Sequence, residues 1–225
     1  MKTYVNELKT LSSAKLKAFN EALIPSTKYE ILGVATPKIR ELAKAIGTDD
    51  EFLKSLPHQY HEENMLHAMM LTLAKTGINE RIKYIKEFLP YVDNWAVCDS
   101  LLKPSNRFIK EKDTLLSFGE ELVGRTETYH IRFGLGLFLS YSLKMSDITQ
   151  YLQLSLNIQN NDYYVEMMQA WFYATALINH SDDILKLLQE NKLSTFVHNK
   201  TIQKAIESYR VSEELKQTLR QLKRV

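Results

Sequence analysis

Helical periodicity runs through almost the whole chain and constrains its fold more than any other feature. Apolar side chains recur at three- and four-residue spacing, and convincing alternation of the strand type is absent. Only seven glycines and five prolines interrupt the 225 residues. Cap and turn residues such as Thr36-Pro37 and Gly124-Arg125 separate the helical segments. The sequence therefore predicts an all-α protein.

The predicted helices recur in pairs. Successive first helices are centred on or begin near residues 60, 95, 130, 165 and 200, a period of roughly 35 residues. Pairs of this size cannot bury their apolar faces alone, so they stack into a superhelix. The aromatic-Leu-Gly pattern of tetratricopeptide pairs is missing, which favours HEAT-like pairs. We expect a single HEAT-like α-solenoid domain over residues 1–225, with about six helix pairs.

The cysteine usage and the absence of long apolar segments indicate where the protein works. Cys98 is the single cysteine, which excludes an intramolecular disulfide framework and fits a reducing compartment. Its apolar neighbours favour a buried structural thiol over a nucleophile. The first residues lack a continuous apolar stretch, and no later segment stays apolar for about 18 residues. We expect a cytoplasmic protein without a membrane partner, nucleoid-associated if it binds DNA.

The formal net charge of +2 is small but unevenly distributed. From residue 200 onward, seven Lys and Arg face three acids, which gives the C-terminal segment a local excess of positive charge. Such a run is most often a solvated helix face. It is also the composition of a surface that faces phosphates, and both interpretations stay open at this point.

The stretch Asp93-Asn94-Trp95-Ala96-Val97-Cys98-Asp99, near the middle of the chain, is the strongest candidate for a site. Asp93 in the N-cap position and the apolar run after it predict a helix. Trp95 and Asp99 then lie one turn apart on the same helix face, so that a flat π-surface stands beside a carboxylate. The structural alternative is that Trp95 fills a seam between repeats while Asp99 pairs with a basic neighbour.

Other apparent motifs indicate structure. The six-residue spacing of His61 and His67 places them on different helix faces, which argues against a zinc-protease motif, and we expect both at the surface or partly packed. Gly134 and Gly136 lie inside a helical pattern without a preceding strand, which favours close helix packing over a dinucleotide loop. A group of large side chains is assigned to the core: Met167, Met168, Trp171 and Phe172.

Four segments together resemble one family. They are Ile31-Leu32-Gly33-Val34-Ala35-Thr36-Pro37 with Arg40 after it, Asn94-Trp95-Ala96-Val97-Cys98-Asp99, Ile131-Arg132-Phe133, and Asn199-Lys200-Thr201-Ile202-Gln203-Lys204-Ala205-Ile206. In order and spacing they resemble the AlkD-type DNA alkylation repair family of HEAT-like repeat DNA glycosylases, over nearly the whole chain. The resemblance implies hydrolysis of the N-glycosidic bond of cationic alkylpurines, such as 3-methyladenine and 7-methylguanine, in double-stranded DNA, with no metal or cofactor.

The resemblance also implies roles for single residues. Asp99 would stabilise the oxocarbenium-like sugar and orient a water toward it. Trp95 would hold the cationic nucleotide by a cation–π contact worth about 0.5–2 kcal/mol. Arg132 matches the family arginine that helps to hold the DNA backbone or the carboxylate. The remaining expected DNA contacts, in a protein expected to be a monomer, are Lys204, Arg210 and Arg40.

The chain departs from the family pattern at two places. Active relatives carry an aromatic residue after the Lys-Ala-Ile segment, where this chain has Ser208. They also carry a helix that enters the DNA minor groove, whereas Ile24-Pro25-Ser26-Thr27 breaks the helical pattern here. Three functions stay open: an alkylpurine glycosylase that uses Asp99 and Trp95, a divergent member with weak DNA binding and little or no excision, and a peptide-binding helical repeat.

Overall fold

The computed structural model describes residues 2–102 and 106–224. Over these residues it contains fourteen α-helices, two short 3-10 helices and no β-strand, and only isolated bridges pair Ser12 with Val34 and Glu30 with Tyr60. The prediction of an all-α, HEAT-like helical-repeat fold is confirmed. No helix in the described ranges is long and apolar enough to cross a membrane.

The chain divides into two compact units, residues 1–111 and 112–225. The first unit begins with two short helices, continues with an irregular segment from Ile24 to Ala35, and then becomes regularly helical. Its elements are α1 (Val5–Thr10), α2 (Ala14–Leu23), α3 (Thr36–Ile46), α4 (Asp50–Lys54), α5 (His61–Leu73), α6 (Ile78–Phe88), η1 (Leu89–Tyr91), α7 (Trp95–Leu101) and η2 (Asn106–Glu111).

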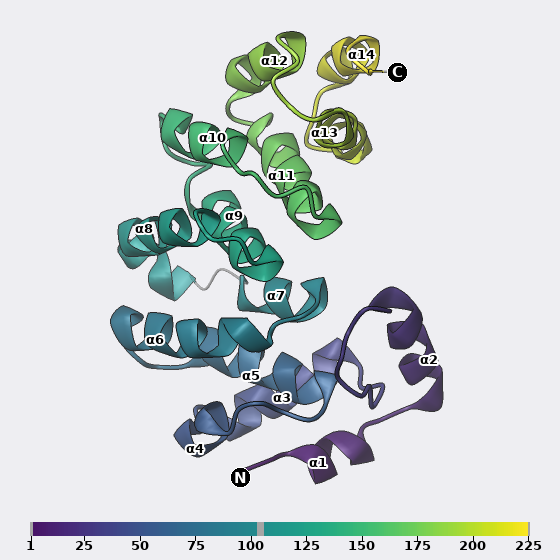
Figure 1. The fold of residues 1–225 in the computed structure, drawn as a ribbon, viewed down its shortest axis with the longest axis vertical. Helices are drawn as coiled ribbons and strands as arrows, with labels where there is room; N and C mark the ends of the chain where they lie inside the picture. The colour runs from purple at the N-terminus through teal and green to yellow at the C-terminus, as the bar shows by residue number, and fades with distance from the viewer. Residues whose placement is uncertain (1, 103–105, 225) are drawn as a thin grey trace. The chain divides into compact units, whose positions relative to one another are not determined.

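Helix α5 is the centre of the first unit. It packs against α3 on one side and α7 on the other, and every residue of α5 except Leu73 is buried. The neighbouring helices contribute fully buried large side chains such as Phe52 and Phe88. Helix α2 lies at the edge of the unit and buries none of its residues (Figure 1). The break in helical pattern expected after Leu23 is present, because α2 ends there.

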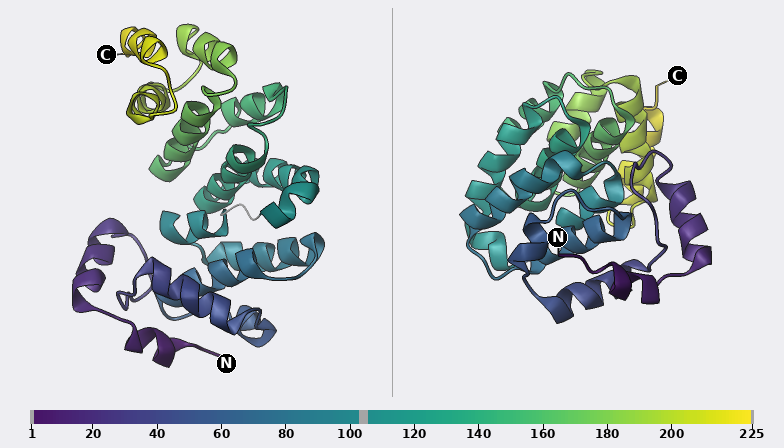
Figure 2. Two further views of the ribbon diagram at one scale, coloured as in Figure 1. Left: turned by 180° about the vertical axis from the view of Figure 1, so that it is seen from behind. Right: turned by 60° about the horizontal axis from the view of Figure 1, so that its bottom comes forward.

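The second unit is a more regular array. Its helices are α8 (Lys112–Val123), α9 (Thr128–Tyr141), α10 (Thr149–Leu156), α11 (Tyr163–Ala176), α12 (Ser181–Gln189), α13 (Thr195–Glu207) and α14 (Glu213–Gln221). Helices α9, α11 and α13 pack side by side in one row, and α8, α10 and α12 form a second row beside it, to the left of the first in Figure 1 (Figures 1 and 2). Two stacked rows of antiparallel neighbours are what consecutive helix pairs produce.

The glycine pattern on α9 reflects close helix packing, as predicted. A Cβ atom added to Gly134 would lie 2.8 Å from the backbone oxygen of Gly119 on α8, too near for any side chain. A Cβ at Gly119 would in turn meet Phe138 at 2.9 Å. The α8–α9 contact therefore depends on these two glycines. The sequence also predicts a helix that opens at Pro104-Ser105 and reaches about Val123. Its start lies outside the described residues; from residue 106 on, η2 comes first and α8 then ends at Val123.

Candidate functional site

Helix α7 carries the tryptophan and the carboxylate that the sequence singled out. Its N-cap is Asn94, whose side-chain oxygen accepts the N–H of Val97 at 3.1 Å. The prediction of Asp93 as N-cap is therefore wrong. The Asp93 carboxylate instead accepts hydrogen bonds from Thr27 Oγ1 at 3.0 Å and from the backbone N–H of Lys28 at 2.7 Å. It fastens the irregular segment after α2 to the start of α7.

Trp95 and Asp99 line one cavity in the first unit, which we call the Trp95–Asp99 cavity and which has a volume of about 290 Å³. Both side chains are half-buried, and their four-residue spacing places them on the same face of α7, as predicted. Helices α2, α3 and α5 and the segment before α3 supply the other walls. Large apolar side chains dominate these walls: Phe19, Leu23, Ile39 and Met65.

His61 is the imidazole that lines this cavity, and it is only 4% exposed. Burial lowers the pKa of this imidazole below its usual value, against the opposing effects of Glu62 and Asp93. His61 is therefore neutral near pH 7. Among the described residues that line the cavity, Asp99 is then the single charged side chain. The cavity combines apolar walls, an indole face and one carboxylate.

His67 lies in different surroundings from His61, as the six-residue spacing predicted. Its Nδ1 atom is 2.9 Å from Nε2 of His58, and its ring stacks on Phe88 with a centroid distance of 3.9 Å. The expectation that His61 and His67 are surface or partly packed residues is wrong, because α5 is surrounded by other elements and both side chains are buried. The described residues contain no cluster of three or more metal-ligand side chains.

Helix α2 forms one wall of the cavity, and Glu62 on α5 anchors the segment that follows this helix. Its fully buried carboxylate accepts the backbone N–H groups of Leu32 at 2.9 Å, Gly33 at 2.7 Å and Val34 at 3.2 Å. Gly33 has φ +87°, and a Cβ there would lie 2.5 Å from the backbone oxygen of Ser13 at the start of α2. The Ser13 N–H also donates to the Gly33 carbonyl at 2.9 Å. Sequence reasoning missed Glu62, whose partners are main-chain groups about thirty residues earlier.

The second unit holds a larger hollow, which we call the Trp171 groove. It has a volume of about 500 Å³ and is lined by side chains from α11, α13 and the residues that follow α13. Lys204 and Arg210 are two of them, so the structure brings these predicted DNA contacts together. Glu207 contributes one opposing charge. The groove therefore has a small excess of positive charge.

Two exposed aromatic side chains also line the Trp171 groove. Trp171 is 41% exposed and Tyr209 is 95% exposed. The assignment of Trp171 to the core is wrong, although Met168 and Phe172 are buried as expected and Met167 is half-buried. Helix α11 is covered on two sides by α9 and α13, which leaves a narrow stripe of it uncovered. Ser208 lines the same groove. The aromatic side chain that the family resemblance places at this position is missing, but Trp171 and Tyr209 provide aromatic rings beside it.

The other two predicted DNA contacts, Arg132 and Arg40, do not line the Trp171 groove. Arg132 on α9 is 6% exposed, and its Nη1 donates to the backbone oxygen of Tyr164 at 2.7 Å, so it takes part in the α9–α11 packing. Arg40 on α3 is half-buried, and its Nη2 atom is buried without a hydrogen-bond partner among the described residues.

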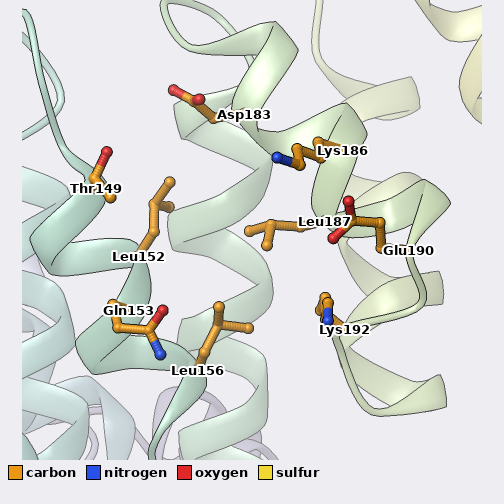
Figure 3. Close-up of a pocket in the computed structure, with 9 residues that line it drawn as sticks. All are labelled: Thr149, Leu152, Gln153, Leu156, Asp183, Lys186, Leu187, Glu190 and Lys192. Carbon is orange, nitrogen blue, oxygen red and sulfur yellow. The ribbon is translucent and has the colours of Figure 1, made fainter.

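A third hollow, of about 450 Å³, lies between α10 and α12 in the second unit (Figure 3). Leu152 and Leu156 face Leu187 across it, and the charged side chains around it are two acids and two lysines. Because these charges cancel, this hollow does not favour a phosphate or a cation.

Comparison with known families decides the class of protein. The family described as DNA alkylation repair enzyme matches residues 4–208, which include the whole first unit from α1 onward and reach Ser208. The chain belongs to this family. A search of curated proteins finds no match. In this DNA alkylation repair family member, Trp95, Asp99, Arg132, Lys204 and Arg40 lie within the matched range, and Arg210 lies just beyond it.

Proposed function

We propose that this DNA alkylation repair family member is a DNA glycosylase that removes cationic alkylpurines, such as 3-methyladenine and 7-methylguanine, from double-stranded DNA. The observation that carries the proposal is that Trp95 and Asp99 line the same cavity, in which Asp99 is the single charged side chain among the described lining residues. An indole face can hold a cationic nucleotide, and a carboxylate can stabilise the positive charge that develops on the sugar.

The reaction breaks the bond between C1′ of the deoxyribose and the purine nitrogen. The bonding electrons leave with the alkylated purine, which departs as a neutral base because it was cationic in the substrate. Positive charge develops on the sugar at the same time, and the Asp99 carboxylate stabilises it. A water oxygen then bonds to C1′ and gives up one proton to bulk water, which leaves a hydroxyl group on the sugar. Because the low-dielectric apolar walls strengthen this charge interaction, the cavity suits the transition state.

DNA binding is assigned to basic residues outside the cavity. Lys204 and Arg210 in the Trp171 groove supply the main phosphate contacts, and Arg132 and Arg40 are retained as further proposed contacts. Aromatic side chains next to cations are typical of nucleic-acid surfaces, because bases stack on them while the cations hold phosphates. Trp171 and Tyr209 supply that aromatic surface here.

A second candidate function is a divergent family member that binds DNA weakly and excises little or nothing. Its support is the short N-terminal region: α2 has ten residues, buries none of them, and is followed by twelve residues, 24–35, without an α-helix. Such a region offers little to insert into a DNA groove. The peptide-binding alternative from the sequence has weaker support, because the Trp171 groove carries cations beside its aromatic rings.

The test is single-turnover excision of 7-methylguanine from a duplex oligonucleotide, with the protein in excess. We expect excision by the parent protein and at least about 100-fold slower excision by the Asp99→Asn variant, whose circular dichroism spectrum should be unchanged. Absence of excision by the folded parent protein, for 3-methyladenine as well, would favour the divergent-member alternative. DNA binding that weakens steeply with salt, through counterion release, would distinguish the glycosylase and the divergent family member from a peptide-binding scaffold.

A further inference from the structure

A second cavity of the first unit has a different lining from the Trp95–Asp99 cavity, and no described residue lines both. We call it the N-terminal cavity, because its walls come from residues between 2 and 9 and between 57 and 63. Its volume is about 470 Å³, within the range of small-molecule sites, roughly 300–1,000 Å³. The cavity therefore has room for one small molecule that carries a ring.

Two lysines supply the positive charge of this cavity. The Nζ atom of Lys2 lies 5.6 Å from the ring centre of Tyr4, and the Nζ atom of Lys9 lies 5.3 Å from the ring centre of Tyr60. Neither lysine takes part in an ion pair with an acid among the described residues. Both ammonium groups are therefore available to an anion.

Glu63 is the single carboxylate among the described lining residues, and it already has partners. It is 2% exposed and accepts hydrogen bonds from Thr3 Oγ1 and from the backbone N–H groups of Gln59 and Tyr60, the latter two at 3.2 Å. These bonds stabilise the carboxylate without a lysine. They also fix both parts of the wall to α5, so binding loses little free energy to ordering.

His58 contributes a neutral polar group to the wall. It is 6% exposed, and its Nε2 atom is 2.9 Å from Nδ1 of His67. Burial lowers the pKa of His58 to about 4, against the opposing effect of Glu63, so its ring is neutral near pH 7. When His67 donates in this contact, the proton of the His58 ring is on Nδ1, where it can be donated to an anion.

These features favour a phosphate monoester as the ligand. A phosphate monoester has a charge of about −1.5 to −2 at pH 7, which matches two ammonium groups better than a single carboxylate does. Lysine is a common phosphate ligand in proteins. Val5, Pro57 and Tyr60 offer apolar surface to the rest of the molecule. A nucleoside monophosphate combines the charge, the ring and the size that the cavity accepts.

We propose that the N-terminal cavity binds a phosphate monoester of the nucleoside type, with Lys2 and Lys9 on the phosphate and with Val5 and Pro57 against the ring. The inference goes beyond the proposed glycosylase function and does not depend on it. A free nucleoside monophosphate and the 5′-phosphate at the end of a DNA strand have the same chemistry. The experiment therefore has one arm for each source.

The first arm measures binding of 2′-deoxyadenosine 5′-monophosphate by isothermal titration calorimetry at neutral pH and low salt, with deoxyadenosine as the control ligand. We expect the monophosphate to bind about ten-fold more tightly. Lys2→Gln and Lys9→Gln should each weaken its binding about three-fold, and the double variant about ten-fold. The matched control variant is Lys15→Gln, because Lys15 is exposed on α2 and does not line the cavity.

The second arm compares two duplexes of the same sequence, one with 5′-phosphate ends and one with 5′-hydroxyl ends, by fluorescence anisotropy. Tighter binding of the phosphorylated duplex, lost in the double variant, assigns the cavity to a DNA end. Equal binding of the two duplexes, together with selective binding of the monophosphate, assigns it to a free nucleotide. Both outcomes support the phosphate site.

The proposal is overturned if the protein distinguishes neither the monophosphate from deoxyadenosine nor the two duplexes from each other. It is also overturned if monophosphate binding survives in the double variant. Lys204→Ala then shows whether the nucleotide occupies the Trp171 groove instead, since that groove also carries two cations. Because Lys2 and Lys9 are exposed, the circular dichroism spectrum of the double variant should match that of the parent protein.

Discussion

The Trp95–Asp99 cavity and the Trp171 groove each present a tryptophan to solvent, yet they differ in charge and in construction. The cavity is small, has one carboxylate and no Lys or Arg among its described lining residues, and depends on an irregular segment held by Glu62 and Asp93. The groove is larger, carries Lys204 and Arg210, and follows from regular packing of α11 against α13. Under the proposed function, the cavity carries the chemistry and the groove carries the DNA affinity, so the two properties should be separable by mutation.

The largest expected effect tests this separation at the cavity. Asp99→Asn removes the negative charge but keeps the size of the side chain. We expect excision to fall about 100- to 1,000-fold, because the carboxylate acts on the developing sugar cation, while affinity for the duplex changes by no more than about two-fold. Single-turnover kinetics and fluorescence anisotropy measure the two quantities. A parallel loss of affinity and excision would mean that cavity and groove are not separable.

The second prediction concerns how the cavity is built. Glu62→Gln places an NH₂ group among three backbone N–H donors, so part of this buried cluster loses its acceptor. We expect a loss of about 3 kcal/mol in the free energy of unfolding, measured by urea denaturation. Glu80→Gln on α6 is the control, because Glu80 is exposed and should change stability by less than about 0.5 kcal/mol. An unchanged unfolding midpoint for Glu62→Gln would contradict the anchoring role.

The third prediction uses His58 and His67, the buried histidine pair of the first unit. Burial lowers the pKa of His58 to about 4, against the opposing effect of Glu63, and burial lowers the pKa of His67 well below its usual value. The unfolded chain therefore takes up protons first as the pH falls, near the usual histidine pKa of about 6.5. Stability is full above this value and is lost as the pH falls from about 6.5 to 4, by about 3 kcal/mol for His58 alone.

Urea unfolding at stepwise lower pH measures this loss. His58→Asn removes one titrating group and should flatten the curve over the same range. Amide hydrogen exchange should show opening of α5 before α9 and α11 as the pH falls. Simultaneous opening of α5, α9 and α11 would contradict the prediction that the first unit is the more sensitive of the two to acid.

The smallest expected effects concern the Trp171 groove. Removing one positive charge, by Lys204→Ala or Arg210→Ala, should weaken DNA binding a few-fold and lower the slope of log affinity against log salt by about 0.9, without changing the excision rate at saturating protein. Lys186→Ala is the control, since Lys186 lies at the charge-balanced hollow of Figure 3. An unchanged salt slope for both groove variants would remove the groove from the proposed DNA surface.

The regular helices were predictable from the sequence because local rules determine them. Serine favours the N-cap position, and Ser194 and Ser212 each accept a backbone N–H at the start of the last two helices. Trp95 and Asp99 were placed on one face by their spacing alone. The single-domain expectation over residues 1–225 and the functional roles of the site residues stay predictions.

The errors arise where tertiary contacts overrule local patterns. Trp171 sits in an apolar helix, and sequence periodicity does not reveal which stripe of α11 its neighbours leave uncovered. Asp93 and Asn94 are both good caps, and the contacts of Asp93 with Thr27 and Lys28 decide between them. Glu62 was missed because a carboxylate that binds main-chain N–H groups of a distant segment leaves no pattern in the sequence.

The attachment made by Glu62 has a consequence for how the cavity can vary among related sequences. It involves only main-chain N–H groups of residues 32–34, so substitutions at Leu32 and Val34 leave the attachment itself intact, whereas Gly33 and Glu62 are not replaceable without loss. Val34 also lines the cavity. A mutation at Val34 can therefore change the shape of the Trp95–Asp99 cavity without loosening its wall, so the cavity can vary between related sequences while its attachment to α5 stays the same.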